Sequence, residues 1–348
     1  METLYNCHIH TFTEKDIPDK FLPLRLVRFI ARQEGYEWLA FILHNANPFS
    51  ERDALDRYLS FVKTGRLGSQ RLVFEECLKQ YPTGTKFIIH PMDMAYMGAG
   101  NVPRDYIEQL IELKRMRDAY KDISNDAVIP FVHIDPRRPG HYELFMQAIE
   151  QWGFRGVKLY PPIGVFPYDK RLMKIYEYCE NKRVPVLAHC TAGNPVYWKG
   201  SHKQLIRMLQ DCLLRIDYEG KTDKELCSYF THPLGYKIVM NNFPDLKVCL
   251  AHFGRETEWD SIILDMIDKY ENLYVDISYS MSDENHWAKL KVLLSTNKRF
   301  AERCLFGSDF YMVKIECTEK QFGIKLRAYL GEELFHKIAV INPIKYLD

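Results

Sequence analysis

The sequence predicts a single (β/α)8 barrel (TIM barrel) over residues 1–348, and three observations support this fold class. Short apolar runs alternate with longer amphipathic segments, which is the pattern of βα units and a parallel sheet. Eight such runs are present, the number that a closed barrel requires. The chain has 348 residues, whereas such barrels have about 250 and grow by loop insertions, so no second domain is needed.

The expected strands are short, and several are apolar almost throughout. A run such as Val-Pro-Val-Leu-Ala at 184–188 is typical of a parallel strand that is buried on both faces. The eight expected strands are Leu4–His10, Lys86–His90, Ala127–His133, Arg155–Tyr160, Val184–His189, Leu246–His252, Leu273–Tyr279 and Arg303–Ser308.

Amphipathic segments lie between the expected strands. Residues Asp105–Tyr120, Lys170–Asn181 and Trp259–Tyr270 carry apolar side chains near the helical period. Two connections are long, namely residues 11–85 after the first strand and 190–245 after the fifth. Both leave the carboxyl ends of their strands, where barrel enzymes build substrate pockets. We therefore interpret them as helical insertions that form cap and lid elements.

Charge and hydropathy argue against several classes of partner. The formal net charge is +1, which provides no electrostatic reason to expect nucleic acid or a membrane surface. No run approaches the roughly 18 apolar residues of a membrane helix, and the first residues lack the pattern of a signal peptide. The nine cysteines form no Cys-x-x-Cys pair, which favours free thiols and a cytoplasmic location.

Potential metal ligands stand where the expected strands end. His8 and His10 end the first strand, His189 the fifth and His252 the sixth, and Asp309 follows the eighth. Parallel strands of a barrel all end at one rim, so these side chains should converge despite their separation in sequence.

The His-x-His pair has a geometric reason. Side chains alternate along a strand, so His8 and His10 should point into the barrel while Cys7 and Ile9 face the helices. Imidazole nitrogens with one carboxylate hold Zn²⁺ and leave a position open for water. The metal lowers the pKa of that water from about 15.7 toward about 7, and Asp309 is the candidate for accepting its proton.

Several segments together resemble the amidohydrolase superfamily, in particular the amidohydrolase-related branch that includes aminocarboxymuconate-semialdehyde decarboxylase and lactonases. The resemblance implies that His8, His10, His189 and Asp309 bind a catalytic metal, and that His252 is either a ligand of a second metal or a general acid/base. The matching segments, in family order, are Cys7-His8-Ile9-His10, Gly153–Pro161, Pro185–Cys190, Leu250–Gly254, Tyr274–Ser278 and Leu305-Phe306-Gly307-Ser308-Asp309.

Lys158 bears on the number of metals. In binuclear relatives a lysine on the fourth strand is carbamylated and bridges two ions, so Lys158 becomes a ligand only if it is carbamylated. The Gly-Val-Lys-Leu-Tyr-Pro pattern at 156–161 also resembles that of single-metal members. We expect one Zn²⁺, with two ions, or Mn²⁺ instead, as alternatives. The usual acidic residue before His-x-His is replaced by Asn6-Cys7, which could alter the support of the ligands.

Other residues are candidates for contact with a substrate. Arg255 offers bidentate donors for a carboxylate or phosphate, with a surface salt bridge as the alternative. His90 and His133 end the second and third strands, and Tyr160 shares the parity of Lys158. Asp276 either orients a neighbouring group or satisfies backbone donors.

The leading hypothesis is a metal-dependent hydrolase that cleaves a C–O or C–N bond in a small carboxylated, lactone, ester or amide substrate. Non-oxidative decarboxylation is the first alternative. A TatD-like phosphoesterase or nuclease is a second, although such enzymes carry glutamate where this chain has Lys158. A barrel that binds a partner within an assembly is the third. A homodimer is expected by analogy with the branch.

Overall fold

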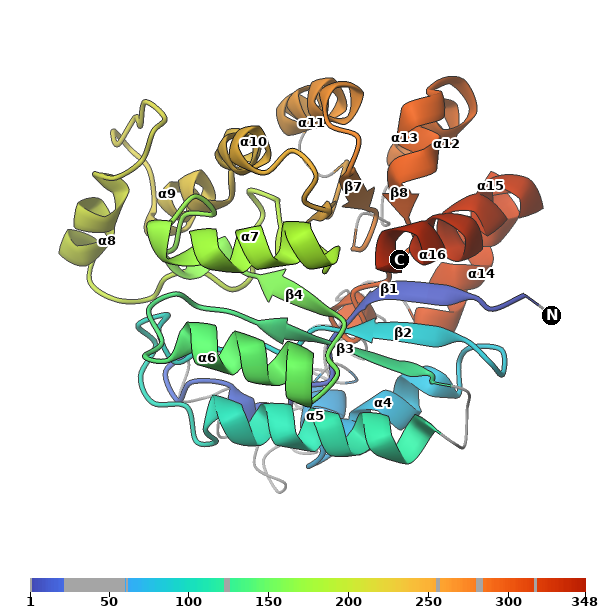
Figure 1. The fold of residues 1–348 in the computed structure, drawn as a ribbon, viewed down its shortest axis with the longest axis horizontal. Coiled ribbons are helices and arrows are strands. Elements are labelled where there is room, and N and C mark those ends of the chain that lie inside the picture. The colour runs from blue at the N-terminus through green and yellow to red at the C-terminus, as the bar shows by residue number, and fades with distance from the viewer. Residues whose placement is uncertain are drawn as a thin grey trace, which may run out of the picture.

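Eight parallel strands form one sheet in chain order (Figure 1). The computed structural model describes residues 2–21, 60, 62–121, 126–254, 257–279, 284–315 and 318–348. The strands are β1 (Tyr5–Ile9), β2 (Lys86–Ile89), β3 (Val128–His133), β4 (Gly156–Leu159), β5 (Val186–His189), β6 (Val248–Ala251), β7 (Leu273–Asp276) and β8 (Cys304–Leu305). Each lies within a predicted strand, so the barrel prediction is confirmed.

Backbone hydrogen bonds join the last strand to the first. The Cys7 N–H donates to the Phe306 carbonyl at 2.8 Å, and the Asp309 N–H donates to the His8 carbonyl at 2.8 Å. A parallel bridge between Ile9 and Phe310 extends the pairing. The carboxyl end of β8 is thereby held against His8 of β1 and against His10, which follows the strand.

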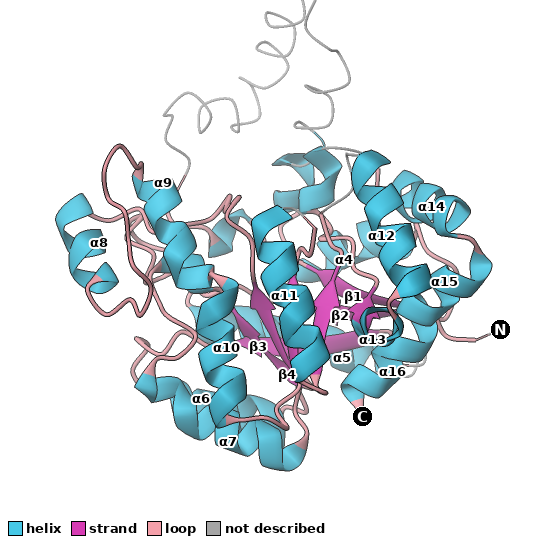
Figure 2. Cartoon of the chain, turned by 90° about the horizontal axis from the view of Figure 1, so that it is seen from above, coloured by secondary structure: helices cyan, strands magenta, loops and turns pink. Residues whose placement is uncertain are grey.

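Helices surround the strands in both views (Figures 1 and 2). The three predicted amphipathic segments correspond to α5, to α7 with the short helical turn before it, and to α11. The helices are α4 (Gln70–Leu78), α5 (Tyr106–Lys121), α6 (His141–Met146), α7 (Met173–Lys182), α8 (His202–Leu209), α9 (Asp223–Leu226), α10 (Pro233–Asn242), α11 (Thr257–Lys269), α12 (Glu284–Thr296), α13 (Lys298–Arg303), α14 (Glu319–Leu330), α15 (Glu332–His336) and α16 (Asn342–Leu347).

The two predicted insertions differ in how far the structure describes them. After β5, the helices α8 and α9 stand at one edge of the molecule, before α10 rejoins the ring around the strands (Figure 2). Most of 11–85 falls outside the described residues, and a lid role stays a prediction for both segments. Among the described helices, none combines the length and apolar content that crossing a bilayer demands.

The apolar core has two layers. The outer layer lies between strands and helices and includes Ile9 and Val157. The inner layer fills the barrel with side chains from seven strands, among them Cys7, Phe131 and Leu305. The ring of Phe131 lies so close to its register partner Gly156 on β4 that a Cβ there would lie 2.4 Å from the ring. Glycine is therefore needed at this point of β4.

A β-bulge in β1 overturns one prediction. Asn6 pairs with Phe87 while Ile9 pairs with Ile89, so β1 has one extra residue in this interval. The predicted outward orientation of Cys7 is wrong, because Cys7 packs in the inner layer while Ile9 packs outside. The bulge resets the alternation, and His8 and His10 both remain directed into the barrel mouth.

Tyr346 of α16 closes the inner layer and provides a stability prediction. Its side chain is fully buried against Tyr274, and its hydroxyl has no hydrogen-bond partner among the described residues. Replacing Tyr346 by phenylalanine is expected to leave the free energy of unfolding unchanged or raise it by about 1 kcal/mol, because an unpaired buried hydroxyl is costly.

Chemical denaturation of two variants checks this expectation. The control is Tyr176→Phe, since the equally buried Tyr176 hydroxyl donates to the Pro167 carbonyl at 2.6 Å. That variant should lose about 1–2 kcal/mol. Equal losses in the two variants would contradict the prediction.

Candidate metal centre

Three hydrogen-bond acceptors converge at the mouth of the barrel. The Asp309 Oδ1 atom lies 3.2 Å from His10 Nε2 and 3.7 Å from His8 Nε2. The opposite ring nitrogens, both Nδ1, are committed as donors: that of His8 to Asp276 at 2.8 Å and that of His10 to the His90 carbonyl at 2.7 Å. In the neutral rings, both Nε2 atoms therefore present lone pairs toward the carboxylate.

This arrangement fits a cation. Asp309 Oδ1 is buried and has no hydrogen-bond partner in the described structure, although two nitrogens are near it. Tetrahedral ligands about 2.1 Å from a metal lie about 3.4 Å from one another, close to the two observed separations. Nitrogen, nitrogen and carboxylate oxygen form a donor set that suits Zn²⁺ and other divalent ions of the first transition row.

Burial favours the neutral form of three histidines of the site, namely His8, His189 and His252. The pKa of His8 is well below its ordinary value, chiefly because the ring is buried and secondly because Lys158 is close. Burial likewise lowers the pKa of His189 and His252. Neutral imidazole is the form that binds metal, so no proton has to leave these rings first.

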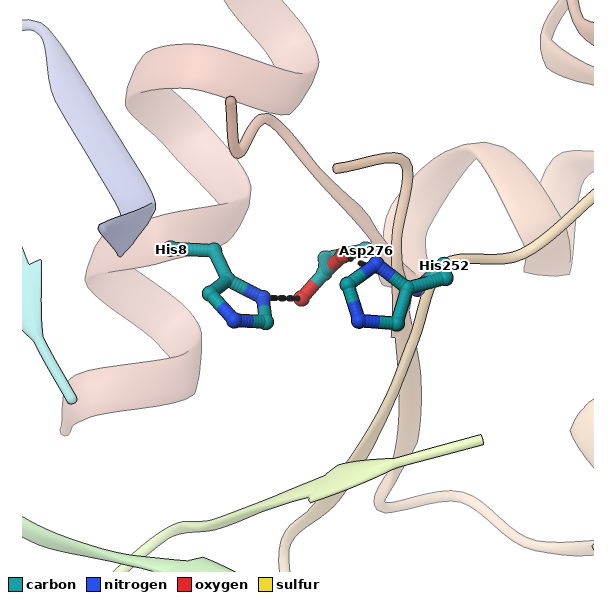
Figure 3. A group of neighbouring side chains, drawn as sticks. All are labelled: His8, His252 and Asp276. Carbon is teal, nitrogen blue, oxygen red and sulfur yellow. Dashed lines mark hydrogen bonds and ion pairs between the residues drawn. The ribbon is translucent and has the colours of Figure 1, made fainter. Parts of the chain in front are cut away.

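Asp276 orients two histidines from the end of β7. Figure 3 shows its carboxylate between the rings of His8 and His252. Oδ2 accepts from His8 Nδ1, while Oδ1 accepts from the backbone N–H groups of His252 at 3.1 Å and Ser278 at 2.9 Å. Asp276 therefore both orients a neighbouring group and satisfies backbone donors, which were the two alternatives predicted for it. Because these polar atoms already form hydrogen bonds with one another, the cluster is better suited to orienting His8 and His252 than to binding a second ion.

His252 and His189 face each other across the mouth. His252 Nε2 lies 3.0 Å from His189 Nδ1, and His252 Nδ1 lies 2.9 Å from the Ser278 carbonyl. His189 Nε2 lies 2.8 Å from Asn194 Oδ1. Among the described residues, the groups compact enough to share an ion contain His8 with His10 and Asp309, or His8 with His252 and Asp276, but not His189.

Lys158 lies beneath the centre. Its side chain is fully buried, and Nζ donates to His8 Nε2 at 3.2 Å. Burial lowers the pKa of Lys158 to about 8, and the carboxylates of Asp276 and Asp309 act in the opposite direction. The amine thus approaches the atom of His8 that also faces Asp309.

Backbone strain concentrates at the same place. Of the five non-glycine residues with positive φ in the described chain, three line the mouth: His252 at 68°, Tyr279 at 58° and Asp309 at 61°. Such conformations cost about 1–3 kcal/mol each and persist where the surrounding structure imposes them, often at functional sites.

A cavity opens above these residues. Its floor carries His10, His189, His252 and Asp309. Its walls are mainly apolar and aromatic, and they include Phe12, Met92, Met94, Tyr160, Val196 and Met312. The described lining has no lysine or arginine, so a negative group on a ligand would have to meet the centre at the floor.

A family model described as amidohydrolase matches residues 7–348. The chain belongs to the amidohydrolase family. This confirms the resemblance drawn from the separate motifs and gives the converging residues a setting in a family of metal-dependent enzymes. No curated protein sequence matches the chain at a significant level.

Solved structures support the fold of this amidohydrolase. An uncharacterized TIM-barrel protein from Bordetella bronchiseptica is 18% identical, with a TM-score of 0.60 and coverage of 99% of this chain and 98% of that one. The 2,6-dihydroxybenzoate decarboxylase from Rhizobium is 12% identical (TM-score 0.55; 100% and 99%). The 5-carboxyvanillate decarboxylase from Novosphingobium aromaticivorans, complexed with manganese and a nitrobenzoic acid, is 14% identical (TM-score 0.57; 99% and 96%).

The candidates for substrate contact in this amidohydrolase occupy different places. Tyr160 lies on the cavity wall, with its ring centre 4.3 Å from that of His189. His90 is fully buried beneath His8, and its Nε2 lies 3.1 Å from the Cys7 carbonyl. His133 is buried and does not line the cavity, and its Nδ1 accepts from the Asp93 N–H at 2.7 Å. Arg255 lies outside the described residues.

Sequence reasoning missed three contributors to the amidohydrolase site. Ser278 contacts His8 and His252, with Oγ 3.0 Å from Nδ1 of each. Asn194 holds His189, and Gly307 leaves room for His8. Ser278 follows Asp276 by two residues and Gly307 precedes Asp309 by two, so period-two spacing was an available signal for both. Asn194 lies in a loop and had no such signal.

Proposed function

We propose that this amidohydrolase is a metal-dependent hydrolase that cleaves a C–O or C–N bond in a small, largely apolar substrate such as a lactone, ester or amide. His8, His10, His189 and Asp309 would hold one ion, with Zn²⁺ as the expected metal and Mn²⁺ as the alternative. The observation that carries this proposal is the convergence of three acceptors on one point beneath an apolar cavity.

The metal ligands need different degrees of adjustment. His8 and His10 already present Nε2 toward Asp309, with their Nδ1 atoms fixed by Asp276 and by the His90 carbonyl. His189 would have to turn from Asn194 to join them. Lys158 would stand beside the ion, or bridge two ions if carbamylated.

A bound divalent cation would lower the pKa of a coordinated water toward about 7 and polarise a carbonyl oxygen. The residues of the chain then have separate tasks. Asp309 would accept the water proton at Oδ2, because Oδ1 faces the imidazoles. His252 would donate a hydrogen bond to the oxygen on which charge develops. Burial is the larger influence and lowers the pKa of His252, while the carboxylates of Asp309 and Asp276 oppose it and so favour the proton that this hydrogen bond requires.

The cavity walls would supply binding energy and exclude water. Met92, Met94 and Met312 are adaptable apolar contacts, while Tyr160 and Phe12 offer aromatic surfaces. Burying an apolar ring or chain of the substrate here contributes roughly 25 cal/mol per Å². Polar parts of the substrate would meet the floor.

Metal content and turnover test the proposal together. Purified protein is expected to carry about one divalent ion per chain, and His8→Ala should lose both the ion and turnover of an ester and lactone panel. About two ions per chain would instead support a carbamylated Lys158. Metal-free protein whose turnover is unchanged by His8→Ala would refute the proposal.

Non-oxidative decarboxylation is the second candidate, and the same cavity favours it. An aromatic carboxylate would place its ring against the apolar walls and its carboxylate at the centre. Two of the structural neighbours are decarboxylases of hydroxylated or methoxylated benzoates by name. Turnover in H₂¹⁸O separates the reactions: hydrolysis places the label in the product, whereas decarboxylation releases carbon dioxide without incorporating solvent oxygen into the aromatic product.

A further inference from the structure

The side chain of Asn6 spans the seam between β1 and the carboxyl end of β8. Asn6 is fully buried, and its Oδ1 accepts from the backbone N–H of His8 at 3.2 Å and of Ser308 at 3.1 Å. His8 is one proposed metal ligand, and Ser308 directly precedes another, Asp309. One amide oxygen therefore fixes the backbone at both strands that carry the centre.

The nitrogen of the same amide faces Glu319, the first residue of α14. Asn6 Nδ2 lies 3.1 Å from Glu319 Oε1, and 2.8 Å from both Tyr81 Oη and Ser308 Oγ. Glu319 is fully buried, and its Oε1 also accepts from the Tyr81 hydroxyl at 2.5 Å. The carboxylate thus lies behind the site, on the side away from the cavity.

The chemistry of these groups determines which way the amide points. An ionised carboxylate only accepts hydrogen bonds, whereas an amide has one accepting and one donating end. Glu319 therefore requires the NH₂ end of Asn6, and the oxygen end must face the N–H groups of His8 and Ser308. A neutral partner such as glutamine would remove this requirement.

The helix supports a negative charge at this position. Glu319 begins α14, and the preceding Thr318 caps the helix with its side chain. The amino end of a helix favours an anion. Burial raises the pKa of Glu319 to about 7, while hydrogen bonds from Ser308 and Tyr81 lower it. At pH 8.5 the group is therefore mainly ionised.

We propose that Glu319 is a positioning residue of the metal centre, which acts through Asn6 to hold the backbone at His8 and Ser308. This inference rests on the proposed metal site. In the described structure, the hydrogen bonds of Glu319 go to Asn6 and Tyr81 and not to a predicted ligand side chain, and Glu319 does not line the cavity. Its effect is on how well the ligands are arranged to receive an ion.

Metal affinity measured without substrate tests the role. Glu319→Gln should bind Co²⁺ about 10- to 100-fold more weakly at pH 8.5 in a chelator competition, the usual cost of losing outer-shell support. The visible spectrum of the cobalt protein should change as well. Glu332→Gln, at the start of α15, removes an exposed carboxylate paired with Arg327 and should leave both readouts unchanged.

A charge exchange makes the test specific. Asn6→Asp alone should also weaken Co²⁺ binding, because it places two carboxylates against each other in a buried site. The double variant Asn6→Asp with Glu319→Gln again pairs one carboxylate with one amide, but the carboxylate is now at position 6 and the amide at position 319. Its affinity should return to within about 3-fold of the wild type, an interaction that independent effects would not produce.

The outcomes separate this inference from the proposed function. A wild-type chain that binds no metal would refute the metal centre itself. Two other results would overturn only the role of Glu319. One is a wild type that binds metal with an affinity unchanged in Glu319→Gln. The other is a double variant whose Co²⁺ affinity is reduced by the combined effect of the two single changes. If Glu319→Gln does not fold, Tyr81→Phe removes the neighbouring donor to the same carboxylate and should weaken Co²⁺ binding in the same direction.

Discussion

Replacing Asp309 by asparagine is expected to abolish most activity while it stabilises the metal-free protein. The carboxylate Oδ1 faces the Nε2 atoms of His8 and His10 without a hydrogen bond. Without an ion, these acceptors repel one another. An asparagine amide could donate to one of the two nitrogens and relieve that repulsion, but it would provide neither the charge for the metal nor a base for water.

Three measurements check the Asp309→Asn variant. Turnover should fall by about 10²–10⁴-fold, the contribution typical of a general base, and bound metal should decrease. The free energy of unfolding of the metal-free variant should be about 1 kcal/mol higher than that of the metal-free wild type, which is the contribution of one recovered hydrogen bond. The control is Asp118→Asn, which changes a partly exposed residue of α5 paired with Lys114 and should leave all three quantities unchanged.

For the prediction to hold, turnover must fall while the free energy of unfolding of the metal-free protein rises. Lower stability of the metal-free variant would show that the carboxylate is held by favourable contacts rather than by an ion. Unchanged turnover would show that Asp309 takes no part in the reaction. A gain in stability with a loss of activity is the pattern expected for a residue that function keeps in an unfavourable arrangement.

Gly307→Ala is expected to displace His8. A Cβ at position 307 would lie 2.7 Å from His8 Cβ and 3.3 Å from both the His8 nitrogen and Ser278 Cβ. His8 cannot shift easily, because its ring is hydrogen-bonded to Asp276 and its backbone N–H to Asn6. Overpacking of this kind costs about 1–3 kcal/mol, and metal affinity should fall together with turnover.

A second glycine of the same region provides the control for Gly307→Ala. Gly323 lies within α14, and nothing lies within 4 Å of a Cβ added there. Gly323→Ala should raise the free energy of unfolding by about 1 kcal/mol, since alanine is the better helix former. Denaturation and metal analysis of both variants decide the matter: if Gly307→Ala gains stability and keeps its metal like Gly323→Ala, the close approach to His8 is not a real constraint.

The barrel itself could be predicted because its pattern is local. Each expected strand contains an observed strand, and the differences are a few residues at the ends. A chain in which apolar runs of this length alternate with amphipathic segments has few other compact folds available to it. The convergence of His8, His10 and Asp309 followed from the same pattern, since parallel strands of a barrel end at one rim.

Other features of the site depend on contacts that no local pattern contains. The orientation of Cys7 was predicted wrongly because a bulge is set by the pairing of β1 with β2, which sequence alternation does not reveal. The part that Asn194 plays at His189 depends on the path of the loop after β5. The link from Glu319 to Asn6 joins residues 313 positions apart.

The sequence by itself therefore determined the order of the strands, the rim at which the candidate site lies and the kinds of side chain gathered there. These depend on period-two and period-3.6 patterns and on residue type at strand ends. Only the tertiary structure decided which ring nitrogens face Asp309, and which groups orient them. Those features arise from bulge geometry, side-chain rotamers and hydrogen bonds between distant segments, because each is settled by what packs against it.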